Sequence, residues 1–263
     1  MLRRTLTFLA LACLMAHPTL AQDAPAQNGT VLIRNGRLLD GMGNPWILGD
    51  VLLRGDRIEA VGRLGDVKAD LVVDATGLYV APGFIDTHTH AGAALTTPEL
   101  SHGRPLLAQG LTTLFANPDG GGPVDLAQQR REFVANRIGP NVAQLVPHGS
   151  VREAVLGQED RAPTAAEMGR MRALVRAGME EGAWGMSSGT FYVPGFYAKP
   201  DEIEDLAKIV AEFRGAYQSH YRDESDATVG LIPSVDEVIN VGRVAGIPAV
   251  LTHVKANGPH VGG

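Results

Sequence analysis

Cysteine is almost absent from this chain: among 263 residues there is one, Cys13, close to the N-terminus. A chain without a second cysteine cannot form an internal disulfide bond. Aromatic residues make up only 5% of the sequence, no run of lysine or arginine exceeds two residues, and the formal net charge is −6. Nucleic-acid binding relies on a basic surface. The composition therefore argues against nucleic acid as a partner and favours an ordinary globular protein.

Long apolar runs are also scarce, and the one that stands out lies at the N-terminus. Arg3–Arg4 precede the apolar run Thr5–Met15, and Thr19–Ala21 offers a small-residue cleavage site. This three-part pattern predicts a secretory signal peptide over residues 1–21, and hence export to the periplasm or outside the cell. A buried N-terminal helix is the alternative, and the arginine pair and Cys13 leave twin-arginine and lipoprotein export open.

The predicted mature chain is acidic and has no membrane span. Taking Arg3 and Arg4 from the 23 basic residues leaves 21 against 29 acidic residues, a net charge of −8. No later segment approaches the roughly 20 apolar residues that a membrane-spanning helix requires. We expect a small molecule as the partner, and the sequence leaves the oligomeric state open.

Short alternating runs broken by turn residues fill the region from residue 30 to residue 81. They predict a small antiparallel β-sandwich-like domain over residues 22–82, too small to close its own sheet. The runs are Val31–Arg34, Val51–Arg54, Ile58–Val61 and Leu71–Asp74.

After Pro82 the pattern changes to alternating strands and helices. Helix starts are indicated by capping boxes at Thr164–Glu167 and Ser234–Glu237 and by Pro200, and Gly246 indicates a helix end. The predicted strands are Phe84–His90, Thr112–Asn117, Val142–His148, Ala183–Thr190, Ala216–Tyr221 and Pro248–Val254.

Strands recur about every 30 to 40 residues, which is the length of one β/α unit. Residues 83–263 hold six such units, about two fewer than a closed TIM barrel. We predict an incomplete TIM (β/α) barrel, with an open doubly wound sheet as the alternative. A site distributed over several strand ends favours the barrel, because it suits a barrel mouth.

Histidines gather where the predicted strands end. His88 and His90, two residues apart, are expected on one face of a strand. Five of the eight histidines fall at the ends of four predicted strands. Imidazoles with a carboxylate suit zinc or a similar divalent ion, which lowers the pKa of bound water to about 7 and polarises a carbonyl. Hydrolysis of a C–N bond is the reaction that these two effects serve. The strand-end residues are His88, His90, Asp119, His148, Tyr192, His220, His253 and Lys255.

Several segments, in order, resemble the amidohydrolase superfamily, and more narrowly its N-acyl-D-amino-acid deacylases (D-aminoacylases). The resemblance runs from about residue 30 to the C-terminus and implies a metal-dependent hydrolase fold that deacylates N-acyl-D-amino acids. Its segments are Pro82–His90, Gly110–Gly120, Gly182–Gly195, Tyr217–Glu224 and Leu251–Ala256.

The resemblance implies a site with one or two divalent ions, expected to be Zn²⁺. His88 and His90 would hold one ion, and Asp119, His220 and His253 the other. Asp119 stands where better-known members carry a bridging cysteine, and a carboxylate is a harder ligand than a thiolate.

The same resemblance implies four residues around the metal. Tyr192, Arg222 and Lys255 would bind substrate, and His148 would lie behind the ligands. For Arg222 an ion pair with Asp223 or Glu224 is the alternative.

The superfamily carries a general acid/base aspartate at the end of its eighth strand, which we expect beyond Gly263. On this interpretation the chain is an N-terminal portion of the enzyme and inactive alone. Two alternatives stay open: another amidohydrolase, such as a dihydroorotase-like cyclic amidase, a deaminase or a dipeptidase, and a non-catalytic truncated product.

Overall fold

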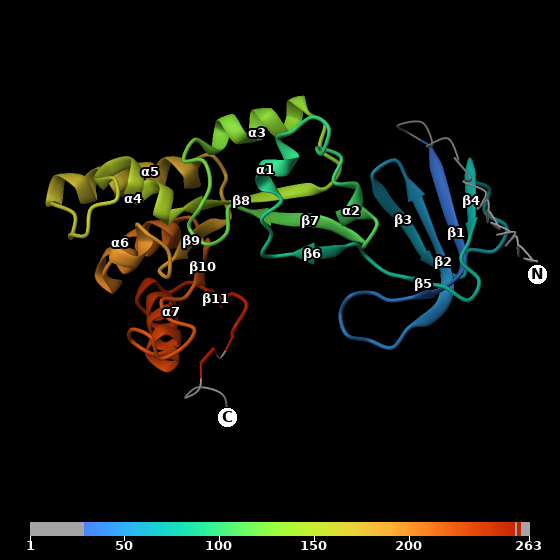
Figure 1. Cartoon of the computed structure of the whole chain (residues 1–263). Helices are drawn as coiled ribbons and strands as arrows, with labels where there is room; N and C mark the ends of the chain where they lie inside the picture. Colours follow the sequence, from blue (N-terminus) through green and yellow to red (C-terminus); the bar gives the residue numbers. More distant parts are fainter. Residues whose placement is uncertain (1–28, 256, 259–263) are drawn as a thin grey trace, which may run out of the picture. The chain divides into compact units, whose positions relative to one another are not determined.

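The computed structural model describes residues 29–255 and 257–258 (Figure 1). The predicted signal peptide, residues 1–21, lies outside this range. The chain divides into two compact units between Pro82 and Gly83. None of the helices in the described ranges is long and apolar enough to cross a bilayer.

The first unit is one sheet, with strand order β3-β2-β1-β4 and with β5 also paired to β1. Neighbours β1, β2 and β3 are antiparallel, as predicted, but β4 and β5 run parallel to β1. The prediction of a purely antiparallel unit is therefore wrong: the chain crosses from β3 to the opposite edge of the sheet and joins β1 in the same direction. The strands are β1 Thr30–Leu38, β2 Ile47–Arg54, β3 Arg57–Gly62, β4 Leu71–Asp74 and β5 Tyr79–Val80.

The second unit is built on a parallel sheet of six strands in the order β11-β10-β9-β8-β7-β6. All six predicted strands exist, and most are shorter than predicted. They are β6 Phe84–Asp86, β7 Leu111–Ala116, β8 Asn141–Pro147, β9 Gly185–Gly189, β10 Ala216–His220 and β11 Ala249–Leu251.

The sheet of the second unit is strongly curled. In a flat sheet, five spacings of about 4.8 Å would separate the edge strands by roughly 24 Å. Yet His88, just after β6, and His253, just after β11, have ring centroids 5.1 Å apart. The ends of the two edge strands therefore converge, as in part of a barrel. The barrel prediction is confirmed, and the open doubly wound alternative is wrong.

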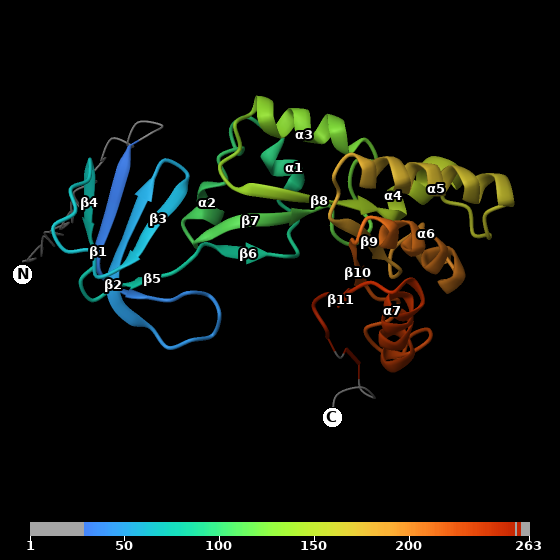
Figure 2. The same ribbon diagram turned by 180° about the vertical axis from the view of Figure 1, so that it is seen from behind.

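Helices follow the outer side of this sheet, with α3, α5, α6 and α7 around it in both views (Figures 1 and 2). The helices are α1 Gly92–Leu95, α2 Arg104–Leu107, α3 Leu126–Ala135, α4 His148–Leu156, α5 Ala165–Glu180, α6 Pro200–Glu212 and α7 Leu231–Ala245, and Gly195–Tyr197 form a 3-10 turn.

Three of the predicted helix boundaries are confirmed and one is wrong. Thr164 and Glu167 form the predicted capping box of α5, and Pro200 opens α6. Gly246 ends α7 in the left-handed region, at φ 69°. The predicted capping box at Ser234 is wrong, because α7 begins at Leu231 and the buried Ser234 hydroxyl donates to the Gly230 carbonyl within the first turn, at 2.8 Å.

The main apolar core of this unit lies between the helices and the strands β8 to β10. Helix α5 contributes Met171 and Val175, α6 contributes Ile203 and Leu206, and all four side chains are fully buried. A smaller cluster of Leu95, Leu114 and Phe133 packs α1 and α3 against β7. This core fixes the strands whose C-terminal ends carry the candidate site.

Candidate metal centre

His88 and His90 lie in the loop after β6, not on the strand itself. The strand ends at Asp86, so the predicted reason for their shared direction, strand alternation, is wrong. The loop is held in two other ways. The Asp86 carboxylate accepts a hydrogen bond from the His88 backbone N–H at 3.0 Å, and the Gln218 side chain on β10 donates to the Thr87 carbonyl at 2.7 Å.

Asp119 projects from a tight loop after β7. Asn117 and Asp119 both lie in the left-handed region, at φ 64° and 55°, a conformation that costs free energy in non-glycine residues. Ser187 on β9 stabilises it: its hydroxyl donates to the Asn117 carbonyl at 2.6 Å and accepts from Gly120 N–H at 3.1 Å. Strained residues held in place by their surroundings are typical of functional sites.

Glycine on the neighbouring strand makes room for this loop. A Cβ at Gly189 would lie 2.2 Å from the Asp119 carbonyl oxygen, which is impossible without movement. The reciprocal bonds between the Asn117 and Gln129 amides, at 3.0 and 2.9 Å, tie the loop to α3. The loop that carries Asp119 is thus held from two sides.

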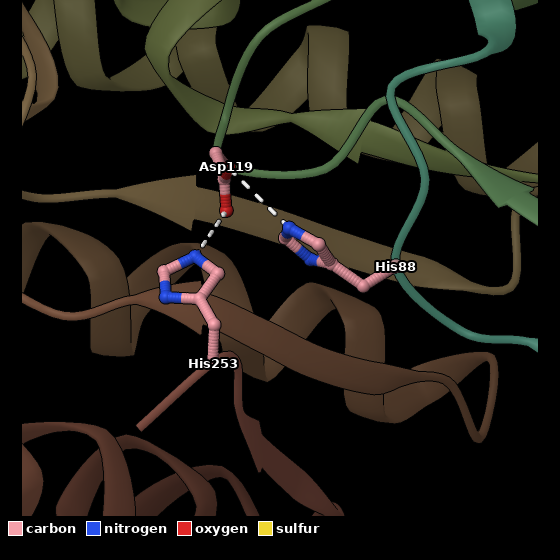
Figure 3. A group of neighbouring side chains, drawn as sticks. All are labelled: His88, Asp119 and His253. Atoms are coloured by element: carbon pink, nitrogen blue, oxygen red, sulfur yellow. Dashed lines mark ion pairs between the residues drawn. The ribbon is translucent and has the colours of Figure 1, made fainter. Parts of the chain in front are cut away.

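Three histidines converge on the Asp119 carboxylate. Its Oδ2 lies 3.5 Å from His88 Nε2 and 3.2 Å from His90 Nε2, and its Oδ1 lies 3.8 Å from His253 Nε2. Figure 3 shows the ion pairs of Asp119 with His88 and His253. Zinc bonds of 2.0–2.1 Å in a tetrahedron separate ligand atoms by about 3.4 Å. The distances found here are of that size.

His220 and His253 face each other at the end of β10 and after β11. His220 Nδ1 and His253 Nε2 are 3.0 Å apart, and His253 lies in the left-handed region at φ 40°. Donor atoms of His88, Asp119 and His253 all lie within 4.8 Å of one another, and so do those of His220, Glu224 and His253. The structure thus brings all five predicted ligands to one place, with His253 shared by the two groups.

Several buried polar atoms at the centre are unsatisfied. Among the described residues, Asp119 Oδ1 and His220 Nε2 have no hydrogen-bond partner. Buried polar groups without partners are rare and costly, and a bound cation would satisfy Asp119 Oδ1. The donor set of imidazole and carboxylate fits a borderline divalent ion such as zinc.

The electrostatics of the centre favour a cation. The hydrogen bond to Asp119 raises the pKa of His88. Burial acts to raise the pKa of Asp119, but the hydrogen bond and charge of His88 and the charges of His220 and His253 leave it below its usual value. Burial, followed by the charge of His253, lowers the pKa of His220. Asp119 is thus ionised and His220 favours its neutral, ligating form.

Tyr192 and Lys255, two predicted substrate-binding residues, border the centre. Tyr192 Oη lies 3.2 Å from His220 Nδ1, and burial raises the pKa of its phenol. Lys255 Nζ lies 2.9 Å from Glu224 Oε1. Both side chains therefore already contact residues of the metal centre.

Arg222 and His148 are held away from the ligands. Arg222 pairs with Glu237 on α7 at 2.7 Å and also donates to the carbonyls of Phe196 and Ala198. The predicted alternative, a pair with Asp223 or Glu224, is wrong in its partner, because the guanidinium reaches α7 instead. His148 is fully buried, and its Nε2 lies 2.9 Å from Glu202 Oε1.

A cleft of about 370 Å³ opens beside the candidate ligands. Its lining includes His90, Asp119, Glu153 and Tyr192. Sequence reasoning missed one buried acid at the centre, Glu224, which is 7% exposed. The feature of the sequence that points to Glu224 is its position four residues after His220, in the segment that follows a predicted strand.

A curled parallel sheet of β/α units, with histidines and a carboxylate at its strand C-terminal ends, is the architecture of TIM-barrel metalloenzymes. The model of the amidohydrolase family matches residues 71–231. The chain therefore belongs to the amidohydrolase family.

Three relatives are informative. N-acyl-D-aspartate deacylase of Alcaligenes xylosoxydans xylosoxydans is 36% identical over 261 residues, covering 90% of this chain and 51% of that protein. A D-aminoacylase studied for its binuclear metal centre has a TM-score of 0.78 and 30% identity, covering 89% of this chain and 53% of that one.

N-acyl-D-glutamate deacylase of Bordetella bronchiseptica, solved with zinc and a phosphonate inhibitor, has a TM-score of 0.73 and 34% identity, covering 84% and 50%. The chain thus spans about half the length of the relatives that it matches.

Proposed function

We propose that this chain belongs to a metal-dependent hydrolase that removes the acyl group from N-acyl-D-amino acids. The observation that carries the proposal is the convergence of the five candidate ligands from four strand ends. The set is His88, His90, Asp119, His220 and His253. It is supported by the two relatives that act on N-acyl-D-amino acids and span most of the chain.

We further propose zinc as the metal, since a deacylase of similar fold was solved with zinc. His88 and His90 would hold one ion, and His220 and His253 a second, with Asp119 between them. When bound, such an ion lowers the pKa of water and polarises a carbonyl oxygen. Asp119 keeps the negative charge that holds the cations in place.

Two surrounding side chains offer a hydrogen-bond donor and a positive charge that suit an N-acyl amino acid. The Tyr192 phenol, next to His220, keeps its proton at neutral pH, since burial raises its pKa above the ordinary 10.0. It can therefore donate a hydrogen bond to the oxyanion that forms when the amide carbonyl is attacked. Lys255, which pairs with Glu224, supplies a positive charge suited to the substrate carboxylate, and Glu224 raises its pKa above the ordinary 10.5.

The test is an assay of the complete gene product with N-acyl-D- and N-acyl-L-amino acids, before and after removal of metal by a chelator. We expect hydrolysis of the D-enantiomers, lost on chelation and restored by zinc. Undiminished hydrolysis after complete removal of metal would contradict the proposal. Turnover of cyclic amides in preference to N-acyl-D-amino acids would identify another amidohydrolase.

We also propose export, on the basis of the N-terminal pattern of residues 1–21. Mass spectrometry of the protein recovered from the producing cell is the test. A mature N-terminus at Gln22 is expected, and an intact N-terminal Met1 would contradict cleavage.

A further inference from the structure

Glu224 is a buried carboxylate behind the histidine pair. It follows β10, is 7% exposed, and is anchored by two neighbours. Lys255 Nζ lies 2.9 and 3.1 Å from its two oxygens. Asn257 donates its side-chain amide to Oε2 at 3.1 Å and its backbone N–H to the Glu224 carbonyl at 2.7 Å. The carboxylate is thus fixed in one orientation.

A single oxygen of Glu224 faces both histidines. Oε1 lies 3.3 Å from His253 Nδ1 and 3.6 Å from His220 Nε2. The other two ring nitrogens, His220 Nδ1 and His253 Nε2, face each other at 3.0 Å. Each ring therefore turns one nitrogen towards Glu224 and the other towards the candidate metal position.

We propose that Glu224 is a positioning residue that fixes the tautomer of His253. A carboxylate favours an N–H on the nitrogen nearest to it, which leaves the lone pair on the other nitrogen. Glu224 thus keeps the proton on His253 Nδ1, which lies 3.3 Å from Oε1. The lone pair of His253 Nε2 is then available to a metal ion and, in the metal-free protein, accepts the 3.0 Å hydrogen bond from His220 Nδ1. This inference rests on the metal centre of the proposed function.

The contacts favour this role over direct ligation by Glu224. Both of its oxygens already contact the Lys255 ammonium, which would compete with a metal ion. The His253 nitrogen next to Glu224 is also the one turned away from Asp119, since His253 Nε2 is the atom 3.8 Å from the Asp119 carboxylate. Loss of a carboxylate behind a metal-bound histidine weakens metal binding by about 10- to 100-fold.

The first measurement is zinc affinity of the metal-free protein by calorimetric titration. We expect Glu224→Gln to weaken the tighter site by about 10- to 100-fold. The matched control is Glu237→Gln, which removes a carboxylate paired with Arg222 and should leave zinc affinity unchanged. A Glu224→Gln protein that folds and binds zinc as tightly as the wild type would overturn the proposal.

The second measurement is the tautomer of His253, from ¹⁵N chemical shifts of the histidines in the metal-free wild-type protein. We expect Nδ1–H on His253, and a mixture of its two tautomers in Glu224→Gln. A wild-type His253 protonated on Nε2 would overturn the proposal, and this test needs no variant to fold. A wild type with the expected tautomer but no zinc binding would contradict the proposed function and leave the orienting role of Glu224 supported.

Discussion

Asp119 is the residue around which the candidate ligands are arranged. Its two oxygens face histidines that come from both edges of the six-stranded sheet, His88 and His90 after β6 and His253 after β11. Its backbone lies in a left-handed conformation that only the surrounding hydrogen bonds maintain. The position of such a residue is determined by the surrounding fold and not by its own backbone preference. Its neighbours should therefore contribute to metal binding together with the ligands themselves.

The pair His220 and His253 should hold the tighter ion. Replacing either with alanine removes one of two nitrogens 3.0 Å apart, and we expect loss of zinc affinity beyond the roughly 100-fold that removal of an outer residue costs. Elemental analysis after dialysis measures this. The control is His102→Ala, an exposed histidine outside the site. Retained zinc in both His220→Ala and His253→Ala would contradict the assignment.

A second residue-scale prediction concerns Glu202, which is 5% exposed and joins α6 to Arg152 and His148 of α4. Burial acts to raise its pKa, but its hydrogen bonds and the charges of His148 and Arg152 hold the pKa below the ordinary 4.5. A lowered folded-state pKa stabilises the fold above the unfolded-state value, and this stabilisation is lost as pH falls through the folded-state value.

Glu202→Gln should therefore lower the free energy of unfolding at neutral pH by about 3 kcal/mol, because Arg152 stays buried without its partner. The difference from the wild type should shrink as the pH falls below about 4.5. Urea unfolding at several pH values measures it. Glu153→Gln, at an exposed position of the same helix as Arg152, is the control. A difference that does not change with pH would contradict the role given to the Glu202 charge.

At the scale of elements, local signals in the sequence were sufficient for some features. The capping box of α5 depends on Thr164 and Glu167 alone, so it can be recognised in the sequence from these two residues and the spacing of three between them. Ser234 has the same spacing to Glu237, but the helix starts earlier, at Leu231, because Gly230 at φ 91° permits the turn before it. Alternation of strands and helices, and hence the barrel, follows from periodicity that every β/α unit repeats.

Features that depend on contacts distant in sequence could not be predicted. The parallel pairing of β4 with β1 joins segments about forty residues apart, such as Val31 with Leu71. The loop that carries His88 is held in part by the hydrogen bond from Gln218 to the Thr87 carbonyl, across 131 residues. The contact of Glu224 with His253 depends on β11, which brings His253 beside it. The ligand residues themselves were predictable because strand C-terminal ends meet at one rim.

The loop that carries Asp119 should tolerate no side chain at Gly189. In Gly189→Ala the new Cβ would lie 2.2 Å from the Asp119 carbonyl oxygen, so the loop must move. We expect zinc affinity to fall by at least about tenfold, as for other residues that orient metal ligands. Titration with zinc measures this, with circular dichroism to show that the fold is kept.

Gly169→Ala is the matched control for this substitution. Gly169 lies within α5, and the position that a methyl group would take there is open, with nothing within 4 Å. Alanine there should leave zinc affinity unchanged and raise stability by about 0.5–1 kcal/mol, because glycine is unfavourable inside a helix. Equal zinc affinities of Gly189→Ala and Gly169→Ala would contradict the argument for the loop.

At the scale of the whole second unit, the candidate ligands join its beginning to its end. They come from the loops after β6 and β7, from the end of β10 and from the residues after β11, so an ion held by them links both edge strands of the curled sheet. A ligand that binds only the folded state stabilises it by about 2.7 kcal/mol at 100 times its Kd. For a unit of this size, this corresponds to a rise in Tm of roughly 5–10 °C.

Scanning calorimetry with zinc at known multiples of the measured Kd should therefore show a Tm that rises with zinc and falls on addition of chelator. The Tm that should rise is that of the second unit, which carries the site. His253→Ala should abolish this rise, because His253 belongs to both groups of donor atoms. Arg222→Lys, which keeps a positive charge beside Glu237, is the control, and its Tm should rise with zinc as in the wild type. A Tm that rises equally with zinc in His253→Ala would mean that the ion stabilises the protein elsewhere, since the link between the two edges of the sheet requires that imidazole.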